Sequence, residues 1–117
     1  MRVLAFEDGY DIEALLTAGG VNIAPLVLEQ RWNSLDALAH IEAFAPDVLL
    51  LDHYMPPATG RAVLETLLAS TITRPATVVA MSSEATMNEA MVRLGADVGV
   101  VKFELATLPM WDPYRST

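Results

Sequence analysis

The stretch VLLLD, residues 48–52, decides the fold. Four consecutive apolar residues followed by a carboxylate indicate a strand buried on both faces, which is typical of the middle of a parallel sheet. Three further apolar runs also end in polar residues: residues 3–6 before Glu7 and Asp8, residues 77–81 before Ser82, and residues 98–101 before Lys102. The chain thus repeats one pattern, a buried strand that carries a polar side chain at its carboxyl end.

Helical patterns alternate with these strands, which predicts an α/β fold with a doubly wound parallel sheet and helices on both faces. The expected helices begin at Tyr10 or Asp11, at Asn33 or Ser34, after Gly60, and near Met87. Residues 21–28 give a weaker strand prediction, because Pro25 interrupts the run. Since proline cannot donate a hydrogen bond to a neighbouring strand, we expect this strand at the edge of the sheet.

The C-terminal part of the sequence predicts less regular structure than the rest. Residues 103–108 favour a short final helix that Pro109 ends. A chain of 117 residues is long enough for one hydrophobic core. We expect residues 1–108 to form that single domain and residues 109–117 to be a loosely ordered tail or linker.

The polar residues after the strands are expected to meet, because the carboxyl ends of parallel strands lie at one edge of the sheet, where ligands bind. Three carboxylates held close together repel one another by roughly 4 kcal/mol per pair at an effective dielectric of about 20, so they need a countercharge. The sequence has no cysteine, and no second histidine gives His53 the spacing of a metal ligand, so the carboxylates are suited to Mg²⁺. The Ser82 hydroxyl and the Lys102 ammonium would complete a clamp for a phosphoryl group, with Asp52 as the candidate nucleophile.

Composition excludes several classes of protein. The sequence has no cysteine, so it forms neither disulfides nor a thiolate metal site. Its formal net charge is −8 and its seven basic residues are scattered, so we expect no direct nucleic-acid binding. No apolar run approaches the roughly 20 residues of a membrane span, and Met1 leads directly into the first strand without a signal peptide. We therefore expect a cytoplasmic protein that does not insert into membranes.

At the strand ends the sequence resembles the receiver domains of bacterial response regulators in two-component signalling, which are CheY-like. That family has an acidic pair after its first strand, Asp-x-x-Met-Pro-x-x-x-Gly after its third, Ser or Thr after its fourth, and Lys after its fifth. The matching residues here are Glu7-Asp8, DHYMPPATG at residues 52–60, Ser82 and Lys102. The resemblance covers residues 2 to about 108 and implies a flavodoxin-like, five-stranded sheet of order 2-1-3-4-5. The last helix, over residues 103–108, would be shorter than is usual in the family.

The resemblance implies a phosphoryl acceptor and a metal site. Asp52 would accept the phosphoryl group in an aspartyl phosphate. Asp8, Asp52 and the main-chain carbonyl of Tyr54 would bind Mg²⁺, and Glu7 would hold a metal-bound water.

The resemblance also implies a switch and its partners. Ser82 would donate a hydrogen bond to the phosphoryl oxygen, and Lys102 would pair with the phosphoryl charge. The donor would be a sensor histidine kinase or a phosphotransfer protein. The switched surface would act on an output protein or domain that the sequence does not identify, or on a second copy of the chain in a homodimer.

Two departures from the family pattern keep a second hypothesis open. Gly99 stands three residues before Lys102, where many receivers carry an aromatic residue that moves with the Ser or Thr. Phe103 stands where the family usually has proline. Together with the short last helix, these departures allow a receiver-like interaction module that works without phosphorylation.

Enzymes built on the same kind of sheet fit the sequence less well. A haloacid-dehalogenase-like phosphatase would need an aspartate at position 54, where this chain has Tyr54. A cobalamin-binding domain would need Asp-x-His-x-x-Gly, but His53 directly follows Asp52. The sequence therefore favours a signalling phospho-acceptor over a metabolic enzyme.

Overall fold

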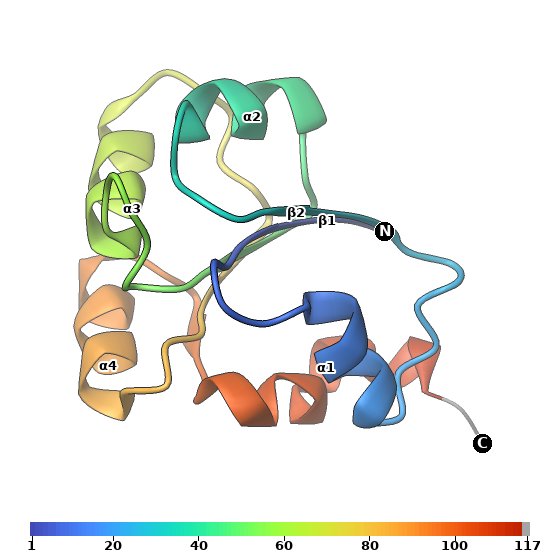
Figure 1. Cartoon of the computed structure of the whole chain (residues 1–117). Coiled ribbons are helices and arrows are strands. Elements are labelled where there is room, and N and C mark those ends of the chain that lie inside the picture. Colours follow the sequence, from blue (N-terminus) through green and yellow to red (C-terminus); the bar gives the residue numbers. More distant parts are fainter. Residues whose placement is uncertain (116–117) are drawn as a thin grey trace.

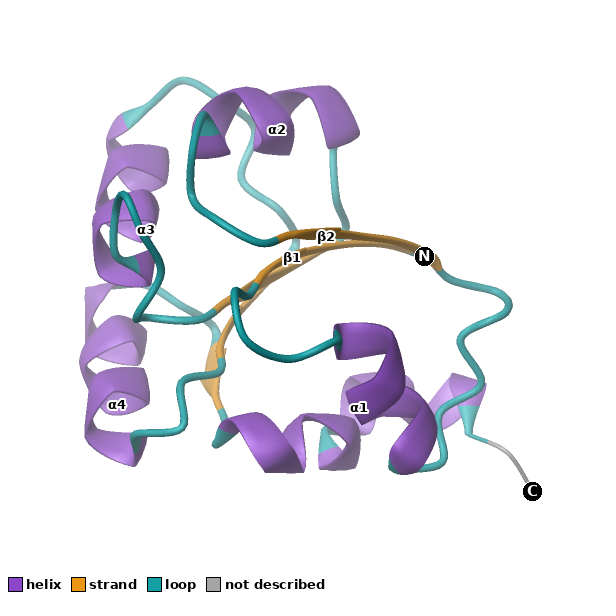
Figure 2. Ribbon diagram, viewed as in Figure 1, coloured by secondary structure: helices purple, strands orange, loops and turns teal. Residues whose placement is uncertain are grey.

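A computed structural model describes residues 1–115 and contains a five-stranded parallel sheet of order β2-β1-β3-β4-β5. Figure 2 shows β1 and β2 nearly edge-on between the helices. The strands are β1 (Arg2–Phe6), β2 (Val27–Arg31), β3 (Val48–Leu51), β4 (Thr77–Ala80) and β5 (Val98–Gly99). The α-helices are α1 (Ile12–Ala18), α2 (Ala37–Phe44), α3 (Gly60–Ala69) and α4 (Ala85–Leu94). Two 3₁₀ helices follow, η1 (Lys102–Thr107) and η2 (Pro109–Tyr114). The predicted flavodoxin-like fold and strand order are confirmed.

Helices cover both faces of the sheet and divide the core into two layers. Figure 1 shows α2 and α3 on one side of the strands and α1 with the C-terminal 3₁₀ helices on the other. Successive side chains of a strand enter opposite layers: Val3 and Ala5 of β1 pack with α1, whereas Leu4 and Phe6 pack with α2 and α3. All residues of β3 are buried, as expected for a central parallel strand.

The register of the sheet aligns the carboxyl ends of its strands. Phe6 lies opposite Leu51, Leu51 opposite Ala80, and Ala80 opposite Gly99. The residues that follow these four positions therefore leave the sheet along one edge. This alignment is what brings the polar residues after the strands into one place.

The first helix begins and ends for identifiable reasons. Asp11 caps α1, because its Oδ1 accepts a hydrogen bond from the Glu13 N–H at 3.0 Å. Gly19 follows the last residue of α1, and a Cβ at this position would collide with Ala106. Glycine there lets α1 lie directly against η1.

The second strand and the second helix both begin later than predicted. The strand expected at residues 21–28 is instead β2, which begins after Pro25 and continues through polar residues to Arg31. Its edge position is confirmed. The helix expected to begin at Asn33 or Ser34 begins at Ala37, because the Ser34 hydroxyl is used elsewhere: it donates to Ala58 O (2.8 Å) and accepts from Ala58 N–H (2.7 Å).

The C-terminal segment is more ordered than predicted. The strand expected at residues 98–101 is shorter, since β5 pairs with β4 only through Val98 and Gly99. Residues 109–115 of the expected loose tail form η2 and a bridge to Val21, while the last two residues of that tail lie outside the described part of the chain. The reason is Trp111, which is fully buried and donates its Nε1–H to Leu105 O at 3.0 Å.

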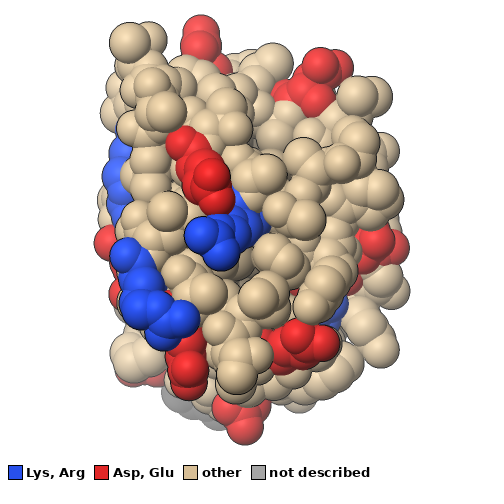
Figure 3. All heavy atoms as spheres, turned by 90° about the vertical axis from the view of Figure 1, so that its left-hand side faces the viewer, with Lys and Arg blue, Asp and Glu red and all other residues tan. Residues whose placement is uncertain are grey.

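The surface carries scattered charges. Figure 3 views the side formed by α3 and α4, where basic and acidic groups lie in small patches on a largely uncharged surface, with no continuous basic area in this view. Within residues 1–115, no helix combines the length and the apolar character that crossing a bilayer requires.

Candidate functional site

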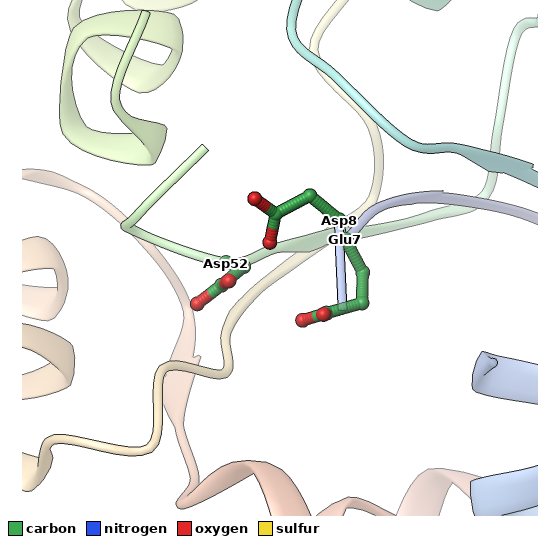
Figure 4. A group of neighbouring side chains, drawn as sticks. All are labelled: Glu7, Asp8 and Asp52. Atoms are coloured by element: carbon green, nitrogen blue, oxygen red, sulfur yellow. The ribbon is translucent and has the colours of Figure 1, made fainter. Parts of the chain in front are cut away.

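The carboxylates predicted to meet do lie together at the carboxyl edge of the sheet. Glu7 and Asp8 follow β1, and Asp52 follows β3. Figure 4 shows the three side chains reaching into the same space beyond the strand ends. One carboxylate oxygen from each lies within 4.8 Å of the other two. The three acids therefore form a cluster that is able to share one cation.

Glu7 is fully buried, and both of its carboxylate oxygens have partners. Its Oε2 accepts hydrogen bonds from the N–H groups of Gly9 (2.7 Å) and Tyr10 (3.0 Å). Its Oε1 receives no hydrogen bond by geometry, yet it lies 2.7 Å from Lys102 Nζ and forms a close ion pair with it. The loop after β1 and the ammonium of Lys102 thus hold Glu7 in place.

Asp52 is almost completely buried, at 3% exposure. Its Oδ1 accepts a hydrogen bond from the His53 N–H at 2.8 Å, and its Oδ2 lies 3.3 Å from Lys102 Nζ. Burial and the nearby negative charge of Glu7 raise the pKa of the Asp52 carboxyl above its usual value, although Lys102 and the His53 N–H act in the opposite direction. This carboxylate is therefore more basic than an ordinary surface aspartate.

Lys102 stands between two carboxylates as their shared countercharge. Burial lowers the pKa of its ammonium, but the hydrogen bond to Glu7 and the charges of Asp52 and Glu7 outweigh burial and raise that pKa overall. The Tyr10 ring lies 5.2 Å from Nζ and packs edge-on against Phe103, with ring centroids 5.0 Å apart. The Tyr10 ring therefore lies beside the ammonium and is itself packed against Phe103.

Ser82 is the buried member of the two adjacent serines, whereas Ser83 is exposed. The Ser82 Oγ accepts a hydrogen bond from the Glu84 N–H at 3.1 Å. Its main chain is bound by Asn88, a residue of α4 that the sequence did not single out. No motif distinguishes one helical asparagine from another, so only the tertiary structure identifies it.

Tyr54 contributes a contact that sequence reasoning missed. The role expected for this residue concerned its main-chain carbonyl, and the side chain is exposed. Its hydroxyl donates a hydrogen bond to Glu84 Oε2 at 2.9 Å, and this bond raises the pKa of the Tyr54 phenol. The contact joins the loop after β3 to the loop after β4, the two loops that follow Asp52 and Ser82.

The chemistry of this site fits a hard divalent cation. Its anionic groups are three carboxylates, and oxygen is the donor that Mg²⁺ and similar ions prefer. Glu7 is held most closely, with its two oxygens 2.7 Å from the Gly9 N–H and from Lys102 Nζ, whereas the contact of Asp52 with Lys102 is longer, at 3.3 Å. Asp8 and Asp52 are therefore the acids better placed for direct ligation. Asp8 is exposed, so an ion would keep part of its water shell there.

The fold of the chain is similar to those of several solved proteins, although its sequence matches no family model. No family model and no curated protein matches the sequence. Among solved structures, the chain is similar to the signal receiver domain of a DNA-binding response regulator from Colwellia psychrerythraea 34H, with 25% identity, 87% of this chain and 85% of that chain covered, and a TM-score of 0.71. It is also similar to the phosphorylated cyanobacterial phytochrome response regulator RcpA, with 20% identity, 90% and 87% covered, and a TM-score of 0.72.

A third similar structure is the Mn²⁺-bound form of the response regulator Rcp1, with 18% identity, 90% of this chain and 88% of that chain covered, and a TM-score of 0.68. These likenesses show that the chain has the CheY-like fold of response-regulator receiver domains. The resemblance inferred from the strand ends is thereby confirmed.

Proposed function

We propose that this chain is the phosphorylatable receiver domain of a two-component or phosphorelay response regulator, with Asp52 as the phosphoryl acceptor. The observation that carries the proposal is the cluster of Glu7, Asp8 and Asp52 within 4.8 Å, with Lys102 3.3 Å from Asp52, at the ligand edge of a receiver fold. Receiver domains are signalling domains rather than metabolic enzymes.

The residues suited to hold Mg²⁺ are Asp8, Asp52 and the main-chain carbonyl of Tyr54, with Glu7 beside a metal-bound water. When bound, Mg²⁺ would supply charge neutralisation for the transferred group. The oxygen-only acidic cluster and the Mn²⁺ bound to the structurally similar Rcp1 support a divalent cation. The choice of Mg²⁺ follows from the donor oxygens and the expected phosphate chemistry.

Asp52 is suited to the role of nucleophile. A carboxylate oxygen of Asp52 would attack phosphorus in line, forming an acyl phosphate as the bond from phosphorus to the donor breaks. Without a cation, burial and the charge of Glu7 raise the pKa of the Asp52 carboxyl, and a bound cation would favour its ionised, nucleophilic form. The Lys102 ammonium would form an ion pair with the new phosphoryl group, and the Ser82 hydroxyl would donate a hydrogen bond to a phosphoryl oxygen.

The proposed partners follow from this chemistry. The donor is a phosphohistidine on a sensor kinase or phosphotransfer protein, and the phosphorylated form acts on an output protein or domain. Release of the group by water would return the carboxylate to its starting state. We place the protein in the cytoplasm, in agreement with its lack of cysteine.

The decisive experiment is labelling by acetyl phosphate, followed by intact mass. We expect the wild-type chain to gain one phosphoryl group in Mg²⁺ and none in excess EDTA, and Asp52→Asn to gain none. Asp36→Asn is the matched control, because Asp36 is exposed and makes no side-chain capping bond. Unlabelled wild type, or labelled Asp52→Asn, would falsify the proposal.

One observation favours a second candidate, an interaction module that acts without phosphate. Lys102 already pairs with Glu7 at 2.7 Å, which balances part of the acidic charge without any added ion. This candidate predicts that Asp52→Asn binds the output partner as the wild type does, under both phosphorylating and control conditions.

A further inference from the structure

Asn88 is a buried amide that binds the main chain on both sides of Ser82. It is 3% exposed, although it belongs to α4. Its Oδ1 accepts a hydrogen bond from the Ser82 N–H at 2.7 Å, and its Nδ2 donates to the Ser82 carbonyl at 2.9 Å. The Asn88 side chain thus binds both main-chain polar groups of Ser82, its N–H and its carbonyl.

The orientation of this amide is fixed by its partners. Nδ2 makes a further bond to Val100 O at 2.9 Å, so it faces two carbonyls while Oδ1 faces one N–H. A flipped amide would place its oxygen against both carbonyls and its nitrogen against the N–H, so the flip is excluded by chemistry. Asn88 therefore joins α4 to the loop after β4 and to the segment after β5.

The same contacts connect Asn88 to Lys102. The Ser82 carbonyl that accepts from Asn88 also accepts from the Lys102 N–H at 3.3 Å. Gly99 gives Asn88 room, because a Cβ there would make tight contacts, 3.1 Å from the Asn88 Cβ and 3.3 Å from its main-chain oxygen. The absence of a side chain at Gly99 leaves the space that this part of α4 occupies.

We propose that Asn88 is a positioning residue that couples the phosphoryl site to α4, an inference that rests on the proposed function of Asp52. A phosphoryl group on Asp52 would draw the Ser82 hydroxyl toward it. The main chain of Ser82 cannot follow without moving Asn88 or breaking its bonds, since both the N–H and the carbonyl are bound. In this proposal the bonds hold, and Asn88 carries the first turns of α4 with Ser82.

The movement would reach the surface at one place. A hollow of about 310 Å³ lies between α4 and the edge strand β5 with the residues that follow it. Its lining includes Asn88, Val92, Gly99 and Val100. A shift of Asn88 changes the shape of this hollow directly. The chain thus has a physical link from Asp52 to its exterior that needs no aromatic residue at position 99.

The test follows amide ¹H–¹⁵N spectra of the full chain during titration with beryllofluoride in Mg²⁺. In the wild type we expect shifts at His53, at Ser82 and along α4. In Asn88→Ala the shifts at His53 and Ser82 persist and those of residues 89–94 are lost. The affinity for beryllofluoride rises several-fold, because the site no longer has to move α4.

Gly99→Ala is the second variant, in case Asn88→Ala does not fold. It keeps the amide but crowds it from the sheet side, so we expect the α4 shifts to shrink. Asn33→Ala removes an asparagine elsewhere, and Ile41→Val destabilises the layer under α2; both should respond as the wild type does.

The outcomes separate this inference from the proposed function. A wild type without beryllofluoride shifts overturns both. Wild-type shifts at His53 and Ser82 together with unchanged α4 shifts and affinity in Asn88→Ala and Gly99→Ala overturn the coupling role alone. A purely structural role would lower the thermal stability of these variants without separating the α4 shifts from those at Ser82.

Discussion

At the scale of single residues, the site is organised around Lys102 before any phosphoryl group arrives. Its Nζ lies nearer to Glu7 (2.7 Å) than to Asp52 (3.3 Å). Glu7 therefore anchors the ammonium, while Asp52 is held less closely and remains the carboxylate that can react. Glu7 and Asp52 thus share Lys102 but have different roles: Glu7 anchors the ammonium, and Asp52 is left as the reactive carboxylate.

Lys102→Met should destabilise the protein, because it leaves two buried carboxylates without their countercharge. Removal of one partner from a buried ion pair costs about 3 kcal/mol or more in the free energy of unfolding. Because the folded-state pKa of Lys102 is raised, its stabilising effect is fully present below the unfolded value of about 10.4 and is lost as pH rises through the folded value. The deficit measured by urea unfolding should therefore narrow above about pH 10.4.

The control for this variant is Arg93→Met, which removes an exposed cation from α4. Exposed charges change stability little, so the unfolding midpoint of Arg93→Met should stay close to that of the wild type. Equal midpoints for Lys102→Met and Arg93→Met would show that Lys102 is not the countercharge of the buried acids.

Asp52→Asn should be more stable than the wild type at neutral pH without metal, by about 0.5 to 2 kcal/mol. The buried Asp52 carboxylate beside Glu7 destabilises the folded protein, and the substitution removes its charge. Burial and Glu7 raise the folded-state pKa of Asp52 above its unfolded value of about 3.9. The wild type therefore loses stability as pH rises through the interval between these values, and the asparagine variant does not.

The measurement is urea unfolding in EDTA at neutral pH and at about pH 4. The advantage of Asp52→Asn should be present at neutral pH and shrink at the lower value. A variant less stable than the wild type at neutral pH would mean that the attraction of Lys102 outweighs burial and the repulsion from Glu7.

At the scale of elements, sequence patterns located most of the fold because buried strands and capped helices leave local signals. The four apolar residues of β3 and the cap at Asp11 are both visible in the sequence. The strand β2 was misplaced because it is a half-exposed edge strand with the sequence VLEQR, which has no apolar run to detect. The start of α2 was predicted too early for a different reason. Ser34 is a typical helix-capping residue, but its hydroxyl binds Ala58 in another loop.

The site was predictable only in part. The strand-end residues could be found because parallel strands force their successors together. The pairing of Glu7 with Lys102, the bond between Tyr54 and Glu84, and the role of Asn88 depend on side-chain geometry across long sequence distances. No local pattern records such contacts.

The helix η2 should contribute strongly to stability, although its sequence predicts a tail. Trp111 is fully buried, and truncation of a buried tryptophan to alanine costs about 3 to 5 kcal/mol. Trp111→Ala should therefore lower the urea midpoint strongly, whereas Trp32→Ala should change stability by less than about 0.5 kcal/mol, because Trp32 is 51% exposed. Equal effects for the two tryptophans would contradict the packing of η2 against the sheet.

At the scale of the whole molecule, stability and function meet in the acidic edge of the sheet. The chain carries a formal charge of −8, and three of its carboxylates lie within 4.8 Å of one another. Lys102 balances only part of this negative charge, so a further cation at the cluster would stabilise the folded state. A ligand that binds the folded form and not the unfolded chain stabilises the protein in proportion to its occupancy.

Mg²⁺ should therefore raise the free energy of unfolding of the wild type, by about 2.7 kcal/mol when its concentration is about 100 times Kd. Thermal unfolding with increasing Mg²⁺ checks this expectation. Asp8→Asn and Asp52→Asn should each lose most of the stabilisation, because each replaces a ligand carboxylate by a neutral amide, while Asp36→Asn should keep it. If all the variants gained as much as the wild type, the ion would be acting on general surface charge rather than at the carboxyl edge.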